Sequence, residues 1–488
     1  MTVANGHTPG KQAIVIGGSV AGLATALALA DAGHQVQILE RDAQEAPATI
    51  DAAAARQRAT VPQAVHSHAF ASLACNLLRK RAADVYEALL EAGGKEINLV
   101  DYPPPALIPV RRRPGDDDLR MVTVRRSTFE LVLLRRVLAR PGVELVRGAT
   151  VRGLLRAEDD PRRVTGVRLA DGTERRADIV VDATGRRSAL SSWLADAGLP
   201  EPRIESENCR IVYYTRHYKL LAKRPPGPLN RGFGAGGLWD SYTAVLFLGD
   251  NDTFSISLGV LPEDAALKDV RHPEPFTAAV RATPMLAGWV APGNSEPISG
   301  VYAMGGLDNM LRLPPSQERP VTGLFAVGDA VCTTNPSYGR GVSLALAHAF
   351  LLADLLTAHP VVDDAQASEY LHRTELLMRP WLEEAKANDR GRAGLWQATL
   401  EGRPPQRPPA GLVTFGLAVA AASQDEEVWR RVANVMMMLQ PPSTLYADDD
   451  VRARIGKVMA GGPPPQLPGA SRAELVAAVE AAVSAVPS

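Results

Sequence analysis

Short apolar runs and an apolar helical run alternate at the start of the chain. Residues 13–16 form an apolar run that predicts a buried strand, and residues 36–39 form a second one. Between them, residues 23–32 are apolar or small on almost every face, so we expect a helix that lies buried against a sheet. The pattern therefore predicts a unit of strand, helix and strand at the N-terminus.

The pattern changes further along the chain. Residues 209–300 contain alternating aromatic and β-branched positions, which predict a separate, largely antiparallel sheet, and the chain is predicted to be helical beyond residue 360. We therefore predict an α/β protein with a Rossmann-like domain, a mainly antiparallel sheet domain and a C-terminal helical region. The predicted Rossmann-like domain comprises residues 1–75, 106–190 and 301–360, the sheet domain residues 76–105 and 191–300, and the helical region residues 361–488.

A glycine turn separates the first strand from the first helix, and Glu40 ends the second strand 18 residues after Gly22. This order suits a dinucleotide, because the helix N-terminus offers unpaired amides to a pyrophosphate and the carboxylate accepts hydrogen bonds from a ribose. Ser19 replaces the usual second glycine, and a structural turn that binds nothing is the alternative. The turn residues predicted to bind the dinucleotide are Gly17, Gly18, Ser19, Val20, Ala21 and Gly22.

A second pattern of strand, turn and helix begins at residue 324. Gly328 and Asp329 follow the strand, and Gly339 and Gly341 precede an apolar helix. We expect Asp329 to accept hydrogen bonds from a ribityl hydroxyl, and the helix N-terminus to stabilise the negative charge of a reduced flavin ring. A nicotinamide ring gains no such charge, so the pattern favours flavin. Residues 232–237 also satisfy G-x-G-x-x-G, but no helix follows, so we predict a flexible loop there and one dinucleotide fold.

These motifs resemble those of the FAD-dependent monooxygenases of the aromatic-hydroxylase fold, also called p-hydroxybenzoate hydroxylase-like. The resemblance covers the whole chain, and Arg126 matches the family's arginine that touches the FAD phosphates. It implies that the Rossmann-like domain binds FAD and that the sheet domain binds the substrate. The further cofactor-binding residues that it implies are Arg41, Val151, Pro336 and Val342.

Three short segments are similar to the bacterial polyether epoxidases, which oxidise polyketide polyenes. The resemblance implies oxygen transfer from a flavin C4a-hydroperoxide to a hydrophobic, polyketide-like or terpenoid-like intermediate, with alkene epoxidation ahead of ring hydroxylation. It also implies molecular oxygen as co-substrate, with electrons from NAD(P)H directly or through a separate flavin reductase. The three segments are Val61-Pro62-Gln63, His66-x-His68 and Asp182-Ala183-Thr184-Gly185.

The sequence contains no compelling catalytic base, which phenol hydroxylation needs and alkene epoxidation does not. His66, His68 and Tyr338 are weak catalytic candidates, and a structural role or contact with FAD is the alternative for the two histidines. No third ligand with metal spacing accompanies them, so no metal site is predicted. Oxygen transfer requires a dry pocket. The aromatic residues predicted to line that pocket are Tyr213, Trp239, Tyr242 and Phe247.

Composition and charge limit the partners. The formal net charge of −1 gives no electrostatic reason to bind nucleic acid or an anionic membrane, and we predict a solvated turn for the charged run at residues 110–118. Three distant cysteines favour a reducing compartment, no signal peptide pattern is present, and the apolar stretch at residues 411–422 is too short to span a bilayer. We therefore expect a cytoplasmic protein without membrane insertion that binds small molecules.

Other functions on the same scaffold are an aromatic ring hydroxylase, a flavin-dependent double-bond reductase and a halogenase. The Trp-x-Trp-x-Ile-Pro motif of flavin halogenases is missing, since Asp240 and Ser241 follow Trp239. A flavin-free binding protein is the alternative from a different class. The presence of Glu40, Arg126 and Asp329 argues against it, because a protein that binds no flavin has no need for all three.

Overall fold

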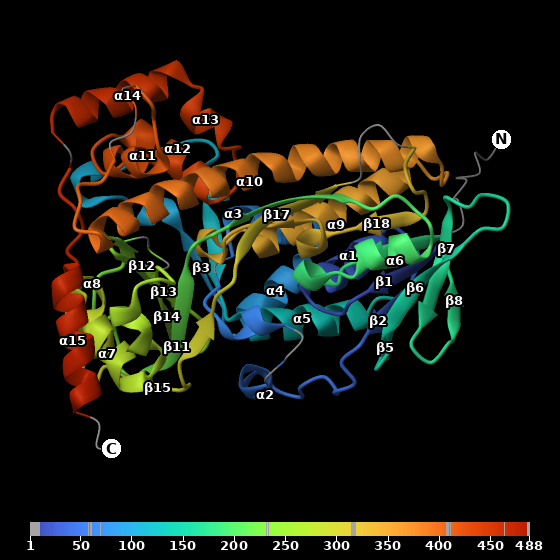
Figure 1. Ribbon diagram of the computed structural model, residues 1–488, viewed down its shortest axis with the longest axis horizontal. Helices are drawn as coiled ribbons and strands as arrows, with labels where there is room; N and C mark the ends of the chain where they lie inside the picture. Colours follow the sequence, from blue (N-terminus) through green and yellow to red (C-terminus); the bar gives the residue numbers. More distant parts are fainter. Residues whose placement is uncertain are drawn as a thin grey trace.

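A five-stranded parallel sheet lies at the centre of the N-terminal part of the chain (Figure 1). The computed structural model describes residues 10–56, 58, 61–68, 70–230, 232, 234–313, 319–406, 409, 411–462 and 464–485. The strand order is β18-β9-β1-β2-β5, so the two strand and helix units predicted from the sequence share one sheet. The bounds are β1 (Gln12–Ile16), β2 (Gln35–Glu40), β5 (Val143–Arg147), β9 (Ile179–Asp182) and β18 (Leu324–Ala326).

Helices cover one face of this sheet and a small antiparallel sheet covers the other. Val15 and Leu27 belong to the cluster beneath α1, α5 and α9, whereas Ile14 and Val180 contact the cluster beneath β6, β7, β8 and α6. The inner strands β1 and β9 are apolar along most of their length because both of their faces are buried, whereas the edge strand β5 is partly exposed and includes charged residues. The bounds are α1 (Val20–Asp31), α5 (Arg126–Leu138), α9 (Gly341–Ala358), β6 (Val151–Arg156), β7 (Val164–Leu169), β8 (Glu174–Arg176) and α6 (Leu190–Asp196).

A six-stranded antiparallel sheet forms the second unit. Its register places His217 of β11 opposite Ser255 of β14, and Ser255 opposite Phe247 of β13. Directly opposite residues point to the same face, so these three side chains share one face of the sheet. The bounds are β11 (Val212–Leu220), β12 (Gly234–Leu238), β13 (Tyr242–Leu248), β14 (Thr253–Val260), β15 (Ser295–Pro297) and β16 (Tyr302–Met304).

The two faces of the second sheet differ in chemistry. Tyr214, Tyr242 and Ile256 lie in an apolar cluster with residues of α7 and α15, which cover that face. The opposite face carries Thr215 and His217 and contacts the segment that precedes α3. The bounds are α7 (Pro273–Ala282), α8 (Pro284–Ala287) and α15 (Arg472–Ser484).

One long helix, α10 (Asp364–Leu400), runs along the molecule and packs on α9 and β17 (Figure 1). The C-terminal helices α11 to α14 lie over one end of it, while α15 packs on the second sheet instead of joining them. A three-stranded sheet, β10-β17-β19, lies beneath α10. The bounds are β10 (Arg203–Asn208), β17 (Asp308–Leu313), β19 (Cys332–Thr333), α11 (Phe415–Ala421), α12 (Glu426–Met436), α13 (Ser443–Tyr446) and α14 (Asp449–Ala460).

Two sequence predictions differ from the structure in local detail. Residues 234–237 of the flexible loop predicted at 232–237 instead belong to strand β12, because they pair with β13. The charged run predicted as a solvated turn binds α12: Arg430 pairs with buried Asp116, and Arg113 lies 3.0 Å from Glu426. The remaining elements are α2 (Ile50–Ala55), α3 (Ser72–Arg81), α4 (Ala83–Glu91), β3 (Lys95–Asn98) and β4 (Arg120–Thr123).

Within the described residues, α9 alone has the length and apolar composition to cross a membrane. This helix is 67% buried inside the protein, between α1, α3 and α10. Its apolar character is therefore explained by its place in the core.

Candidate active site

The first glycine turn lies where β1 meets α1. Gly17 has a φ of +107°, and a Cβ at this position would lie 2.7 Å from the carbonyl oxygen of Ala183, just after β9. A Cβ at Gly22 would lie 1.8 Å from the carbonyl oxygen of Gly17. Only glycine fits at both positions, so the backbone turns tightly and leaves the N-terminus of α1 uncovered by side chains of the turn.

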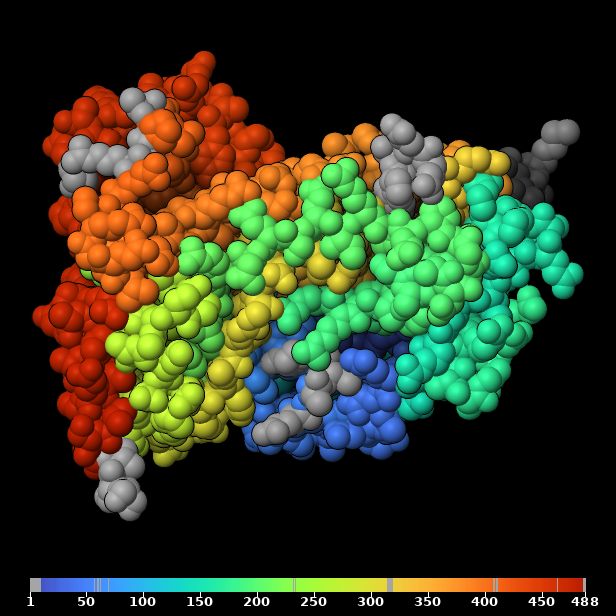
Figure 2. Space-filling model, viewed as in Figure 1, coloured from blue at the N-terminus to red at the C-terminus, as the bar shows by residue number. Residues whose placement is uncertain are grey.

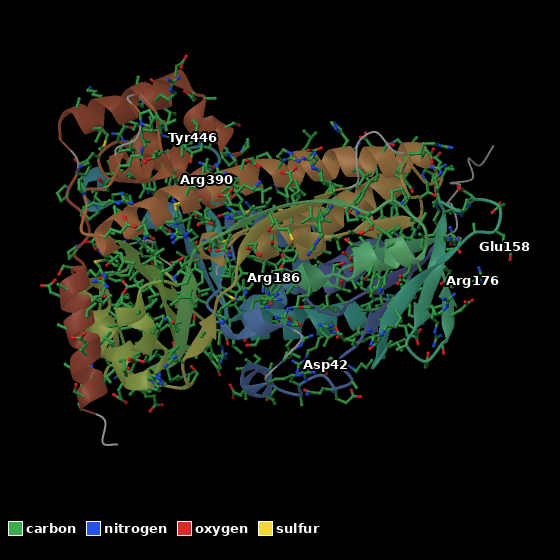
Figure 3. All side chains as sticks on the ribbon, viewed as in Figure 1. Asp42, Glu158, Arg176, Arg186, Arg390 and Tyr446 are labelled. Atoms are coloured by element: carbon green, nitrogen blue, oxygen red, sulfur yellow. The ribbon has the colours of Figure 1, made fainter. Side chains whose placement is uncertain are left out.

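Glu40 ends β2 with its buried carboxylate beside this turn. Its two oxygens accept hydrogen bonds from the backbone N–H groups of Gly18, at 2.7 Å, and Asp42, at 2.8 Å. Figure 3 labels Asp42, which marks this edge of the site near α2. Arg41 is exposed and forms no hydrogen bond or ion pair with the rest of the described chain.

Arg126 begins α5 and reaches back to the glycine turn, where its Nη2 donates to the Ser19 hydroxyl at 3.1 Å. Its Nε is buried without a hydrogen-bond partner and lies 3.6 Å from Glu130. Glu130 accepts a hydrogen bond from Ser19 at 3.2 Å and pairs with Arg58. Neither Arg58 nor Glu130 was expected from the sequence, although Glu130 lies four residues after Arg126 on one helix, where side chains meet.

The second glycine turn packs directly against the first helix. Gly328 has a φ of +58°, and a Cβ there would lie 2.9 Å from Cβ of Ala21 in α1 and 3.6 Å from Cβ of Ala345 in α9. A Cβ at Gly185, after β9, would lie 3.9 Å from Cβ of Asp329. The structure thus brings the turns after β1, β9 and β18 together at one edge of the sheet.

Asp329 carries a carboxylate that no side chain or backbone amide of the described residues hydrogen-bonds. Burial raises its pKa, while the charges of Arg126, Arg186 and Arg312 lower it. Arg186, labelled near the centre of Figure 3, donates instead to the carbonyl of Gly306 at 3.1 Å. An acceptor with positive charges nearby and no bonded partner suits the hydroxyl groups of a ligand.

The loop before α9 is held in a defined shape by Asn335. Its Oδ1 accepts hydrogen bonds from the backbone N–H of Ser337, at 3.1 Å, and from the hydroxyl of Tyr213, at 2.6 Å. Gly339 has a φ of +65°, which lets the loop turn into α9 at Gly341. Val342 follows in the first turn of α9 and is buried.

A buried carboxylate on α10, Asp389, anchors the same loop. It accepts hydrogen bonds from Nδ2 of Asn335, at 2.6 Å, from Nδ2 of Asn309, at 2.7 Å, and from the hydroxyl of Tyr338, at 2.9 Å. Arg392 lies 3.2 Å away and balances its charge. Burial and the nearby Asp389 charge raise the pKa of Tyr338 well above its usual value, so Tyr338 serves as a bound donor here.

Arg340 joins this loop to the C-terminal helices. Its guanidinium pairs with buried Glu384 of α10 and donates to the carbonyl of Trp381 at 3.0 Å. Tyr446, at the end of α13, donates to the same Glu384 at 3.0 Å, and Figure 3 shows it between α13 and α10. Neither Asp389 nor Glu384 was expected from the sequence, because a long helix shows no local sign of which carboxylate points inward.

A cavity of about 410 Å³ lies between the N-terminal unit and the polar face of the second sheet. Figure 2 shows the surface hollowed between the blue N-terminal segment and the green and yellow segments. His66 lies 2.9 Å from the Thr215 hydroxyl, and His68 lies 2.9 Å from the carbonyl of His66 and 3.3 Å from Arg126. Burial lowers the pKa of His66 to about 4 and of His68 to about 3, so both are neutral at pH 7.

The aromatic residues predicted to line the pocket separate onto two faces of the sheet. Phe247 lines the cavity, and Tyr213 shares its face but binds Asn335. Tyr242 lies in the core under α7 and α15, and Trp239 stacks on it at 4.7 Å, so the cavity wall does not include these two. Val151 lies in the apolar cluster on the other face of the parallel sheet, together with Ile16 and Leu39, which directly precede Gly17 and Glu40.

The residues at this edge of the sheet fit FAD. The turn at Gly17 and Gly22 leaves the backbone open to phosphate, and the buried Nε of Arg126 lacks a hydrogen-bond partner. Asp329 lacks a hydrogen-bonded partner within the described chain and lies beside Gly341, at the start of α9. No cluster of three or more histidine, cysteine or acidic side chains suited to a metal occurs among the described residues.

Comparison with known proteins agrees with this geometry. Residues 12–209 match the family model of glucose inhibited division protein A. Protein Rv3254 of Mycobacterium tuberculosis is 28% identical over 458 residues, which cover 86% of this chain and 87% of that protein. Aurachin C monooxygenase/isomerase of Stigmatella aurantiaca is 27% identical over 377 residues, which cover 75% of this chain and 86% of that protein.

Solved structures show the same fold. PqsL of Pseudomonas aeruginosa, a probable FAD-dependent monooxygenase, matches with a TM-score of 0.57 at 14% identity, covering 80% of this chain and 99% of PqsL. The predicted fold class is therefore confirmed. The prediction of an enzyme and the prediction of FAD as cofactor are both confirmed, because the protein shares the fold of PqsL and is related to Aurachin C monooxygenase/isomerase. The matches do not single out the polyether epoxidases.

Proposed function

We propose that this protein is an FAD-dependent monooxygenase that transfers one oxygen atom to a hydrophobic natural-product intermediate, in the first instance by alkene epoxidation. The observation that carries the proposal is the convergence of two glycine turns at Asp329, an acceptor without a hydrogen-bonded partner in the described residues. Such a carboxylate, placed between two helix N-termini, can accept hydrogen bonds from the ribityl group that joins a pyrophosphate to a flavin ring. The relation to Aurachin C monooxygenase/isomerase supports oxygen transfer to a small molecule.

Each part of the site has a role in this proposal. Backbone amides at the start of α1, together with Arg126, bind the pyrophosphate, and Glu40 orients the adenosine ribose. The amides at Gly341 and Val342 direct the positive end of α9 to the ring edge that becomes negative on reduction. Bound FAD supplies the reaction with molecular oxygen, and the protein supplies orientation and exclusion of water.

The protonation state of His66 and His68 in the cavity favours epoxidation over ring hydroxylation. His66 and His68 have pKa values lowered by burial to about 4 and about 3, so neither is tuned to take a proton near pH 7. Alkene epoxidation needs no proton removed from the substrate, whereas hydroxylation of a phenol does. A ring hydroxylase with an activated substrate is the second candidate, and the products distinguish the two.

The described residues contain a single dinucleotide fold, so they offer no second fold dedicated to a nicotinamide cofactor. We propose NAD(P)H as the reductant, acting either by transient contact with the flavin or through a separate flavin reductase. We also place the enzyme in the cytoplasm, in keeping with three cysteines that are all buried and free.

Reoxidation kinetics test the proposal. The protein is loaded with FAD, photoreduced without oxygen and mixed with oxygenated buffer in a stopped-flow spectrophotometer. An oxygenase predicts two resolved phases in the flavin absorbance, with hydrogen peroxide release slower than oxygen uptake. A single phase with immediate stoichiometric peroxide would contradict oxygen transfer, and a colourless protein that never retains FAD would support a flavin-free binding role.

A further inference from the structure

One face of the second sheet carries polar residues in register. Thr215 lies opposite Ser257, and His217 lies opposite Ser255. This is the face that borders the cavity, since His217, Ser255 and the neighbouring Phe247 all line it. Successive residues of a strand point to opposite faces, so Tyr214 and Arg216 face away from the cavity.

Most polar groups on this face are already paired with one another. The Thr215 hydroxyl bonds to His66 at 2.9 Å and to Ser257 at 2.6 Å. The hydroxyl of Ser67 links Ser255, at 2.7 Å, with Ser257, at 2.9 Å. The hydroxyls of Thr215, Ser67 and Ser257 thus each make two hydrogen bonds, whereas the Ser255 hydroxyl makes one, which it accepts from Ser67.

His217 retains one unused acceptor. Its Nε2 lies 3.0 Å from the backbone carbonyl of Val65, which fixes the proton on that nitrogen, because a carbonyl can only accept. The Nδ1 atom therefore carries a lone pair, and no hydrogen bond to it exists among the described residues. Burial lowers the pKa of His217, which keeps the ring neutral and Nδ1 an acceptor.

The charges around the cavity disfavour an anionic ligand. Arg125 is committed to the fully buried Asp250, with Nη2 of Arg125 2.7 Å from the carboxylate. Arg126 is committed to the first glycine turn through Ser19. Asp51 adds a negative charge to the wall, and the remaining lining combines neutral histidines and serines with apolar side chains, among them the rings of Phe247, Phe254 and Tyr302. Both arginines among the described lining residues already pair with a carboxylate, which disfavours an anionic ligand and favours a neutral one.

We propose that this cavity binds a neutral, largely apolar molecule that carries one O–H or N–H donor, such as a phenol, an enol or a lactam, and that the donor bonds to Nδ1 of His217. The inference rests on the proposed function, because it specifies the substrate class of the same enzyme. The strand continues from His217 through Thr215 to Tyr213, which contacts the loop before α9. The four residue steps from His217 to Tyr213 span about 13 Å, so the His217 end of the cavity lies about that far along β11 from the contact with the loop.

The experiment uses three probes that share one ring system: 1-naphthol, 1-methoxynaphthalene and naphthalene. Only the naphthol carries a donor, and naphthalene controls for the bulk of the methoxy group. Binding to the FAD-loaded protein is measured by isothermal titration calorimetry. A hydrogen bond to an otherwise unpaired buried acceptor is expected to make naphthol bind about tenfold more tightly than either donor-free probe.

Three variants test the assignment to His217. His217→Phe keeps an aromatic ring but removes the acceptor, so the preference for naphthol should fall to about one. His217→Gln offers a carbonyl acceptor and an N–H for Val65, so it should restore part of the preference. Tyr214→Phe removes a hydroxyl from the same strand on the opposite face and should leave the preference unchanged.

The inference would be overturned if the unmodified protein bound the three probes with equal affinity or bound none of them measurably. It would also be overturned if the preference for naphthol survived His217→Phe. These results are independent of the proposed function, because calorimetry does not require oxygen transfer. Flavin content and reoxidation phases are measured on the same preparations. A protein that prefers naphthol but reoxidises in one phase would contradict the monooxygenase proposal alone.

Discussion

Nδ2 of Asn335 donates a 2.6 Å hydrogen bond to the buried carboxylate of Asp389, and this bond ties the loop before α9 to the long helix α10. The same carboxylate accepts bonds from Asn309 and Tyr338, so a single side chain orders three donors. The loop that is proposed to receive the flavin ring is thus shaped by a residue more than 50 positions further along the chain. That dependence makes the loop sensitive to changes in α10.

Replacing Asp389→Asn should therefore weaken both the fold and the flavin site. An amide offers one acceptor where the carboxylate offers two, and its N–H₂ group faces other donors. We expect a loss of about 2–3 kcal/mol in unfolding free energy and a flavin affinity about tenfold lower. Chemical denaturation and flavin fluorescence titration measure the two effects. Asp354→Asn, which breaks only the exposed pair with Arg81, is the control and should change both quantities little.

Removing the Asp329 carboxylate should reduce flavin retention without unfolding the protein. The group has no hydrogen-bonded partner in the described chain, so Asp329→Ala leaves no protein donor unpaired. The loss of charge-assisted bonds to a ligand predicts a dissociation constant for FAD raised about 10–100-fold. Asp196→Ala, at the exposed end of α6, is the matched control. Unchanged flavin content in Asp329→Ala would remove Asp329 from the site.

Gly328→Ala should separate the two glycine turns. The new Cβ would lie 2.9 Å from Cβ of Ala21, and the φ of +58° is unfavourable for alanine by about 1–2 kcal/mol before any clash. Thermal unfolding and flavin titration should both show the loss. In Gly391→Ala the added Cβ meets no atom within 4 Å, and in a helix it should stabilise by about 0.5–1 kcal/mol. Equal effects of the two substitutions would contradict the proposed close packing.

The stability of the protein should fall in mild acid because of His348. Its Nδ1 accepts a hydrogen bond from the backbone N–H of Gly328 at 3.2 Å, and burial lowers its pKa to about 3. Below the unfolded pKa of about 6.5, the unfolded chain binds a proton that the folded one does not, at a cost of about 1.4 kcal/mol per pH unit. This contribution is present above pH 6.5 and is lost as the pH falls.

The variant His348→Gln isolates this effect. It should be less stable than the unmodified protein at pH 7.5, and the difference should shrink by about 2 kcal/mol at pH 5. Urea unfolding at the two pH values measures it. A difference that does not depend on pH would show that His348 is not a neutral histidine in the folded state.

The parts of the site that the sequence predicted are those formed by adjacent residues. Gly17 to Gly22 and the pair Gly328-Asp329 each combine a strand end, a turn and a helix start within a few positions, so local pattern reveals them. Asp389 and Glu384 lie on a helix of 37 residues, and only tertiary packing selects which carboxylates point inward. Arg58 follows an alanine-rich segment that gives no signal for an ion pair with Glu130.

The aromatic wall shows a second limit. Tyr242 and Phe247 are both aromatic residues of β13, but they lie an odd number of positions apart and so point to opposite faces. Which face borders the cavity depends on the packing of α7 and α15 against the sheet. The alternation of aromatic and β-branched positions predicted the sheet, whereas the polar residues that border the cavity, such as His217 and Ser255, were identified only from the register.

Isotope labelling shows whether oxygen from O₂ reaches an organic product. The photoreduced, FAD-loaded protein is mixed with ¹⁸O₂ and neutral alkene and phenol probes, and the products are analysed by mass spectrometry alongside a peroxide assay. A monooxygenase should place one ¹⁸O atom in an organic product and release less peroxide than the oxygen it consumes. Oxygen transfer would be contradicted if all the labelled oxygen were recovered as hydrogen peroxide and water with every probe. It would also be contradicted if the oxygen in the product came from water.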